Sequence, residues 1–286
     1  MRAFYSDTFV LPLPDYHRFP MAKYRLLRER IVEEGIVAAD DLHVPDAIAW
    51  ADLRLVHDPA YVDAVATGTL PAAREVLNAN DAVSANLAGG THHAFRDHGE
   101  GYCVFNDVAV AATLLLREGA IARAAVVDCD VHQGNGTAAI FRDEPAVFTF
   151  SLHGANNFPF RKEVSDLDVV FEDGAGDDVY LEALAAHLPA VLDLHRPDLV
   201  FYLAGADPYQ GDRLGRLELT IDGLRTRDRL VFDACRDRRL PVVVAMSGGY
   251  ANDVDAIVTI HANTIREAAA HARVSRSPSC RSVSAC

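Results

Sequence analysis

Four short apolar segments, separated by longer amphipathic ones, most constrain the fold of this 286-residue chain. The apolar segments are rich in Val, Phe or Leu, lack a strict alternation, and cover residues 124–130, 146–152, 199–206 and 241–246. Such runs are typical of strands that are buried on both faces of a parallel sheet. Segments with a helical apolar period cover residues 106–119, 177–195, 220–238 and 252–272. The sequence therefore predicts an α/β fold of three layers, in which helices flank a mostly parallel central sheet.

Local signals mark the ends of two predicted helices. Asn106 is placed to cap the first helix, and Gly119 is a residue type at which helices commonly end. Pro189 lies inside the segment 177–195 and is expected to kink or split that helix, because proline has no N–H to donate.

The composition limits the class of protein. Five cysteines without a CxxC spacing argue against a disulfide framework and for a reducing, cytoplasmic compartment. The first residues lack a secretory signal, and no apolar run approaches the roughly 20 residues that cross a bilayer, so no membrane contact is expected. Residues 274–286 are rich in Ser and Arg and are predicted to be a disordered tail after a single domain at 1–273.

The net charge of −14 argues against a nucleic-acid partner, which would require a basic face. It suits a cationic partner, such as a lysine-rich peptide or a polyamine, although solubility alone also accounts for it.

Polar side chains follow the predicted strands at their carboxyl ends, where ligands bind in open α/β sheets. Asp128, Asp130 and His132 follow the strand at 124–130, Asp207 ends the strand at 199–206, and Tyr250 follows the strand at 241–246. Residues i and i+2 of an extended chain point the same way, so Asp130 and His132 could face one ion and Asp207 could complete three ligands. Oxygen and nitrogen donors with an open position suit catalytic zinc. A turn or helix-cap role is the alternative for each aspartate taken alone.

The adjacent histidines His92 and His93 follow two glycines. Taken alone, the pair fits a surface loop; beside a zinc site, one histidine could take a proton and the other could stabilise charge. Tyr250 lies after Gly248–Gly249 and could donate a hydrogen bond to a carbonyl oxygen. These glycines are not a phosphate loop, because the GxxxxGK spacing is absent.

The sequence contains six motifs in this order: "GGTHHAF", "GYCVFND", "DCDVHQGNG", "SLHG", "AGAD" and "SGGY". Together they resemble the zinc-dependent histone deacetylase family of the arginase–deacetylase fold, and the resemblance covers roughly residues 1–272. The "HQGNG" variant is most similar to class IV members and their bacterial relatives.

The resemblance implies a role for each matching residue. It implies zinc on Asp130, His132 and Asp207, one ion per chain, with His93 as general base and acid. His92 would be the electrostatic partner of His93, Asp128 would orient His92, and Tyr250 would bind the carbonyl oxygen. The substrate channel would be formed by Gly101, Tyr102, Phe158 and Gly249, and a structural potassium ion would be bound by Asp128, Asp130, His132, Ser151 and Leu152.

Two positions depart from the family pattern. Many members have an aspartate where Asn135 stands behind His93, and an amide stabilises an imidazolium less than a carboxylate does. Tyr102 stands where many members have phenylalanine, which adds a polar tip to the channel wall.

These residues favour a zinc amidohydrolase that removes acetyl or longer acyl groups from lysine side chains of proteins or peptides. An acetylpolyamine or other small amide is the alternative substrate. A ureohydrolase of the arginase type is remote, because Gly134 stands where a second metal site would need an aspartate. A non-catalytic acyl-lysine binder is a further remote alternative, since every expected ligand and proton-transfer residue is present.

Overall fold

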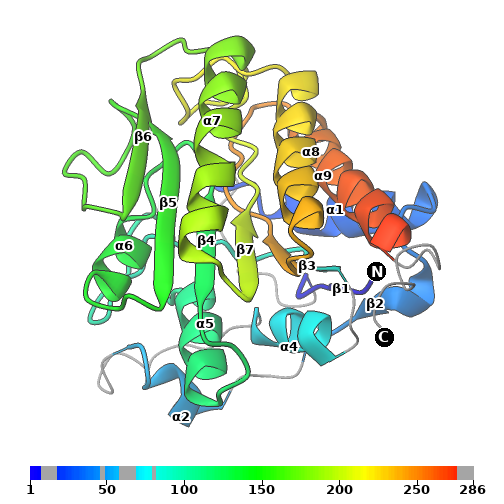
Figure 1. The fold of residues 1–286 in the computed structure, drawn as a ribbon. Coiled ribbons are helices and arrows are strands. Elements are labelled where there is room, and N and C mark those ends of the chain that lie inside the picture. Colours follow the sequence, from blue (N-terminus) through cyan, green and yellow to red (C-terminus); the bar gives the residue numbers. More distant parts are fainter. Residues whose placement is uncertain (8–17, 46–48, 58–68, 79–81, 276–286) are drawn as a thin grey trace.

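One sheet of eight parallel strands forms the centre of the part of the chain that this computed structural model describes, residues 1–7, 18–45, 49–57, 69–78 and 82–275. The strand order is β2-β1-β3-β8-β7-β4-β5-β6 (Figure 1). The bounds are β1 Ala3–Phe4, β2 Leu42–His43, β3 Val83–Asn86, β4 Ala124–Asp128, β5 Val147–Gly154, β6 Leu167–Phe171, β7 Leu199–Leu203 and β8 Val242–Ala245. The predicted α/β class and parallel sheet are confirmed.

Helices cover both faces of the sheet, as Figure 1 shows. One face carries α1 (Ala22–Glu33), α7 (Asp177–His195), α8 (Ile221–Asp237) and α9 (Val254–Ser275). The other carries α2 (Trp50–Leu53), α4 (Leu70–Asn78), α5 (Asp107–Arg117) and α6 (Asn135–Phe141). A short 3₁₀ helix spans Ala39–Asp41.

The buried side chains of β4 alternate between two apolar cores. Ala124 and Val126 pack into the core under α5, whereas Ala125 and Val127 pack into the core under α7 and α8. All four side chains are at most 1% exposed. A strand buried on both faces requires apolar residues at every position, which explains the continuous apolar run in the sequence.

The four predicted strands are present with ends shifted by up to three residues, and β1, β2, β3 and β6 were not predicted. The strands β1 and β2 have two residues each, and β3 alternates polar and apolar residues, so none of them forms an apolar run. The N-cap at Asn106 is confirmed, because its side chain accepts a hydrogen bond from the Ala109 N–H at 3.0 Å.

The predicted split at Pro189 is wrong, since α7 continues through it from Asp177 to His195. Leu184, Leu188 and Val191 flank the proline and are buried against the sheet. Their burial is worth several times the single hydrogen bond that proline removes.

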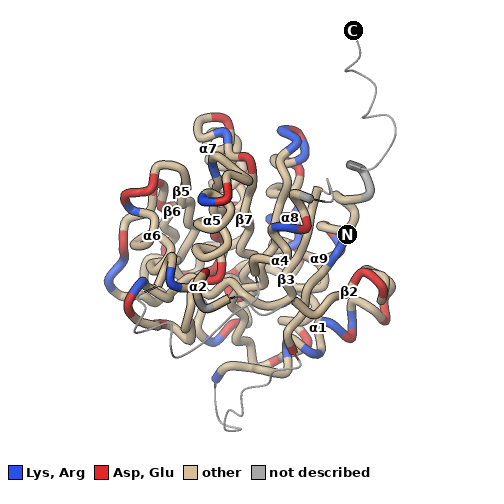
Figure 2. The backbone as a smooth tube through the Cα atoms, turned by 90° about the horizontal axis from the view of Figure 1, so that it is seen from below, with Lys and Arg blue, Asp and Glu red and all other residues tan. Residues whose placement is uncertain are grey.

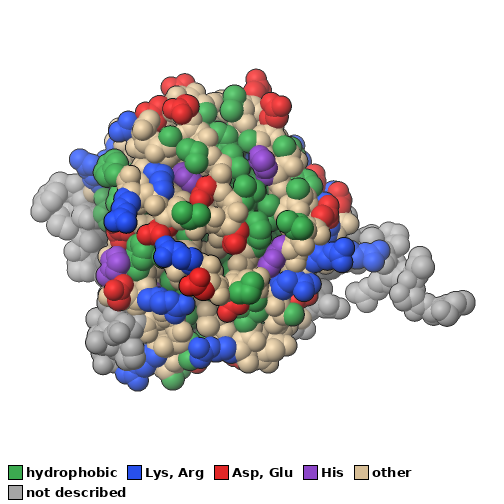
Figure 3. Space-filling model, turned by 60° about the vertical axis from the view of Figure 1, so that its left-hand side comes forward, with side chains coloured by type: hydrophobic (Ala, Val, Ile, Leu, Met, Phe, Trp, Pro, Cys, Tyr) green, Lys and Arg blue, Asp and Glu red, His purple; other side chains and the backbone are tan. Residues whose placement is uncertain are grey.

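Charged residues lie mainly on the helices and connecting loops, and the central strands are largely free of them (Figure 2). Figure 3 shows one face of the molecule, on which basic side chains lie among acidic and hydrophobic ones. No helix among the described residues is both long and apolar enough to cross a membrane. The predicted tail stays a prediction, because α9 ends at Ser275 and residues 276–286 lie outside the described part.

Candidate active site

The predicted site residues follow four strands that are neighbours in the sheet. In the order β3-β8-β7-β4, these strands are followed by His92–His93, Tyr250, Asp207 and Asp130–His132 respectively. Because parallel strands end at the same edge, this order brings together residues that are more than 150 positions apart in the chain.

Asp130, His132 and Asp207 form a buried cluster whose ligand atoms lie within 4.8 Å of one another. His132 Nδ1 is 2.9 Å from Asp130 Oδ1 and 3.1 Å from Asp207 Oδ2. Donor atoms that share a tetrahedral zinc ion at 2.0–2.1 Å would lie about 3.3 Å apart. The cluster therefore has the donor types and the spacing of a zinc site.

The cluster is held by a bend rather than by the strand. The strand β4 ends at Asp128, and the N–H groups of Asp130 and His132 then bind the carboxylates of Asp128 and Asp130 at 3.1 and 2.9 Å. The predicted grouping of Asp130 and His132 was correct, but its reason, an extended chain on which residues i and i+2 point the same way, was wrong. Aspartate side chains that bind the N–H two residues on turn the backbone locally.

Each carboxylate of the cluster is oriented by hydrogen bonds that its other oxygen accepts. Asp130 Oδ2 accepts hydrogen bonds from Ser247 Oγ at 2.7 Å and Gly248 N at 2.8 Å. Asp207 Oδ1 accepts one from Val131 N at 3.0 Å. These bonds leave Asp130 Oδ1 and Asp207 Oδ2 directed toward His132 Nδ1, as a metal site requires.

The charges within the cluster also fit a cation. Burial, followed by the negative charge of Asp130, raises the pKa of Asp207 to about 7. Burial opposes a charge on His132, but the hydrogen bonds to Asp130 and Asp207 outweigh it and raise the His132 pKa to about 10. Two buried carboxylates so close together require positive charge between them, which a divalent ion supplies.

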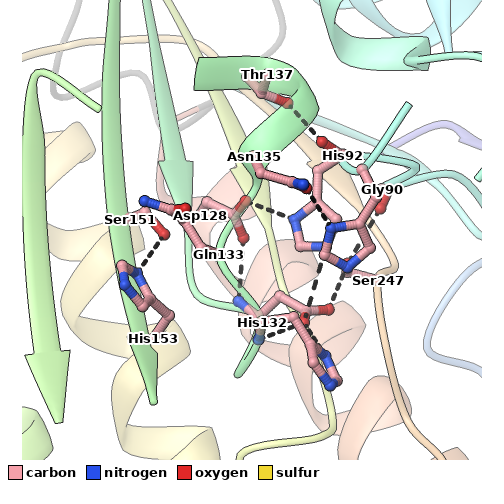
Figure 4. A network of polar contacts seen from close by, with 12 residues as sticks. Gly90, His92, Asp128, His132, Gln133, Asn135, Thr137, Ser151, His153 and Ser247 are labelled. Atoms are coloured by element: carbon pink, nitrogen blue, oxygen red, sulfur yellow. Dashed lines mark hydrogen bonds and ion pairs between the residues drawn. The ribbon is translucent and has the colours of Figure 1, made fainter. Parts of the chain in front are cut away.

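The two histidines beside the cluster have different partners. His92 Nδ1 binds Asp128 Oδ2 at 2.6 Å (Figure 4), and burial is outweighed by Asp128 together with Asp130, which raise the His92 pKa to about 9. His93 Nδ1 binds Asn135 Oδ1 at 2.7 Å. Burial, reinforced by His92 and His132, lowers the pKa of His93 well below its usual range, so the ring is neutral and able to accept a proton.

The loop that carries both histidines is tied to the start of α5. The Asp107 carboxylate accepts hydrogen bonds from Gly90 N at 3.1 Å and Thr91 N at 2.9 Å. Asn106 Nδ2 donates to the carbonyl oxygens of His92 and Ala94 at 3.4 and 3.3 Å. The "ND" of the "GYCVFND" motif therefore positions the histidines through the backbone.

A cavity of about 590 Å³ opens onto His132 of this cluster. Among the residues that line it are His93, His132, Gly101, Tyr102, Phe158 and Tyr250. Phe158 lies 5.0 Å from the His93 ring and Tyr102 lies 6.0 Å from the Tyr250 ring, measured between centroids. Gly249 is not among the described residues that line the cavity; its φ is +137°, and a Cβ there would meet Ile257.

The comparisons with known proteins agree with this geometry. The family model of the histone deacetylase domain matches residues 63–265 of the chain. The chain belongs to the histone deacetylase family. An uncharacterized protein of Picosynechococcus sp. is 42% identical over 283 residues, which covers 90% of this chain and 94% of that protein. Histone deacetylase 2 of Arabidopsis thaliana is 30% identical over 281 residues, covering 85% and 72%.

A solved structure extends the comparison to the fold. The crystal structure of the HDA15 HD domain has a TM-score of 0.79 at 22% identity, covering 94% of this chain and 88% of that one. The described sheet and its flanking helices thus have the fold of a histone deacetylase domain. Membership of the histone deacetylase family supports a hydrolase of the deacetylase type.

Two buried residues near the site of this histone deacetylase family member, Arg227 and Lys23, lie outside the six motifs and were not predicted. Arg227 is fully buried, and its Nη1 donates to the Gly205 and Cys129 carbonyl oxygens. Lys23, on α1, donates to the Ser247 and Gly249 carbonyl oxygens at 3.3 and 3.4 Å, and burial lowers its pKa to about 8. A charged residue on an amphipathic helix gives no sign in the sequence that it points inward.

Ser151 and Leu152, two of the residues predicted to bind potassium, lie on β5. Ser151 is the parallel-register partner of Asp128, and its Oγ lies 3.0 Å from His153 Nδ1. Both residues are buried, and β5 pairs with β4, the strand after which Asp130 and His132 follow.

Proposed function

We propose that this protein is a zinc-dependent amidohydrolase that removes acetyl or longer acyl groups from lysine side chains of proteins or peptides. The observation that carries the proposal is the buried cluster of Asp130, His132 and Asp207, whose His132 lines a cavity of about 590 Å³. The same cavity is lined by His93 and Tyr250, and a pocket of this size accommodates an extended side chain.

The cluster, His93 and Tyr250 each have a chemical role in this proposal. Zinc on the cluster would supply Lewis acidity at an amide carbonyl. Neutral His93 takes a proton from the attacking water and later gives it to the leaving amine. Burial, together with Asp207 and Asp130, raises the Tyr250 pKa well above 10, so its hydroxyl keeps the proton that it donates to the carbonyl oxygen.

The aromatic walls support an aliphatic substrate stem. Tyr102 and Phe158 line the cavity together with Gly101, and the ring of Phe158 lies edge-on to His93. Apolar ring faces favour the methylene groups of an acyl-lysine and leave the amide to reach the cluster.

The rim of the cavity favours a peptide over a polyamine. Among the described residues, three arginines, Arg18, Arg213 and Arg216, line the cavity, against one acidic residue, Glu100. A polyamine would bring further positive charges toward these arginines, whereas a peptide presents one neutral acyl-lysine. The net charge of −14 therefore gives no measure of the charge at the rim.

We also propose a structural potassium ion at Asp128, Asp130, His132, Ser151 and Leu152. The parallel register of Asp128 with Ser151 supports it, since it brings both segments together at one strand edge.

The experiment that tests the function is hydrolysis of three substrate classes by the zinc-loaded protein: acetyl-lysine peptides, longer acyl-lysine peptides and acetylated polyamines. Wild type is expected to cleave an acyl-lysine peptide, Asp207→Ala to lose this activity, and Asp143→Ala, which changes an exposed aspartate, to retain it. Cleavage of polyamines alone would select the alternative substrate, and equal inertness of wild type and Asp207→Ala would overturn the proposal.

A further inference from the structure

The contact between His93 and Asn135 does not by itself fix which end of the Asn135 amide faces His93 Nδ1. An asparagine amide can present either its oxygen or its NH₂ group to a histidine nitrogen. If Oδ1 faces His93, then Nδ1 carries the hydrogen and Nε2 keeps a lone pair. If the amide is reversed, Nε2 carries the hydrogen and His93 cannot accept a proton there.

A third residue decides this direction. Asn135 Nδ2 donates a hydrogen bond to Glu100 Oε2 at 2.6 Å, and Asn135 Oδ1 lies 2.7 Å from His93 Nδ1. A carboxylate only accepts hydrogen bonds, so reversal of the amide would press two acceptor oxygens together at the Glu100 contact. Asn135 is only 2% exposed, which leaves little water to relieve that clash.

The loop that carries Glu100 is fixed against His93. Glu100 and Cys103 exchange two backbone hydrogen bonds of 3.0 and 2.7 Å, and Gly101 and Tyr102 between them have φ values of +54° and +66°. A Cβ on Gly101 would collide with Cδ2 of the His93 ring. The tight turn therefore holds the Glu100 carboxylate at a set place beside Asn135.

We infer that Glu100 is a positioning residue that, through Asn135, sets the His93 tautomer with hydrogen on Nδ1 and a free lone pair on Nε2. This inference rests on the proposed function for its effect on rate, but not for the tautomer itself. Asp128 contacts His92 directly, whereas the carboxylate that serves His93 lies one amide further out, on Glu100.

The first test is spectroscopic and needs no substrate. In ¹⁵N-histidine-labelled, zinc-loaded protein at pH 8, long-range ¹H–¹⁵N spectra are expected to show His93 with hydrogen on Nδ1, assigned by comparison with His93→Asn. Glu100→Gln can turn either polar group toward Asn135, and a signal with hydrogen on Nε2 should appear. An unchanged tautomer in Glu100→Gln would overturn the inference.

The second test measures the change in kcat that Glu100→Gln causes in two backgrounds, and the two changes should have opposite signs. Glu100→Gln is expected to lower kcat about tenfold with little change in KM, as loss of an outer hydrogen-bond partner does. In an Asn135→Asp background, where two carboxylates would face each other, the same substitution should raise kcat. A change of the same sign in both backgrounds, or no change, would overturn the inference.

Matched controls separate this inference from the proposed function. Glu182→Gln, which changes an exposed glutamate on α7, should leave both the tautomer and kcat unchanged. If the tautomer shifts in Glu100→Gln while wild type cleaves none of the substrates, the role of Glu100 stands and the proposed function fails.

Discussion

The guanidinium of Arg227 donates a hydrogen bond to the carbonyl oxygen of Gly205, with 2.6 Å between Nη1 and O. The same nitrogen lies 3.3 Å from the carbonyl oxygen of Cys129, and Nη2 lies 2.8 Å from Asp228 Oδ1. Cys129 precedes Asp130, and Gly205 lies two residues before Asp207. The buried Arg227 guanidinium thus joins the two segments that carry the cluster of Asp130, His132 and Asp207.

Substitution of Arg227 should destabilise the protein and weaken the metal site. Arg227→Met leaves the fully buried Asp228 carboxylate without its counter-charge, which should lower the free energy of unfolding by about 3–5 kcal/mol. Urea unfolding of the metal-free protein measures this loss. Arg227→Met combined with Asp228→Asn should recover part of it. If Arg227→Met unfolds at the wild-type midpoint and keeps wild-type zinc affinity, the bridging role is wrong.

Removal of the Tyr250 hydroxyl should affect the reaction and leave the fold intact. Tyr250 is 8% exposed, and its backbone N–H and C=O bind the side chains of Asp212 and Arg213, so Tyr250→Phe should keep its position. Loss of one hydrogen-bond donor to a developing oxyanion should lower kcat by about 10²–10³. Steady-state kinetics with an acyl-lysine peptide, alongside zinc analysis, measures the effect. A kcat within twofold of wild type would rule out this donor role.

The sequence contained enough information to group Asp130, His132 and Asp207, but it predicted only half of the strands of the sheet. Asp130, His132 and Asp207 could be predicted because chemistry at the carboxyl edge needs particular residue types, and these stand out against apolar strands. The two-residue strands β2, at one edge of the sheet, and β1, next to it, lack that contrast, as does the polar β3, so their pairing depends on the rest of the sheet.

The supporting residues were beyond sequence reasoning for a different reason. Arg227, Lys23 and Glu100 act through contacts with residues far along the chain, and each lies in a segment whose charged residues are mostly solvated. Likewise, the continuity of α7 across Pro189 depends on packing that no local pattern records.

Acid should destabilise the protein through His261. Burial, followed by the positive charges of Lys23 and Arg227, lowers the His261 pKa to about 3. The unfolded chain therefore binds a proton that the folded protein excludes, so stability falls as the pH drops from about 6.5 toward 3. Between pH 6.5 and 5 this histidine should account for a loss of about 2 kcal/mol. Urea unfolding across this range should show a shallower pH dependence for His261→Leu, and equal slopes would contradict the assignment.

The central claim is that Asp130, His132 and Asp207 hold one zinc ion on which amide hydrolysis depends. Its most direct test is a titration of metal-free protein with Zn²⁺, in which bound metal and acetyl-lysine peptide hydrolysis are measured in the same samples. Activity is expected to start near zero, rise with bound zinc and level off at one ion per chain, while Asp207→Ala stays metal-poor and inactive. Full activity without zinc, or a plateau that requires two metal ions per chain, would contradict the claim.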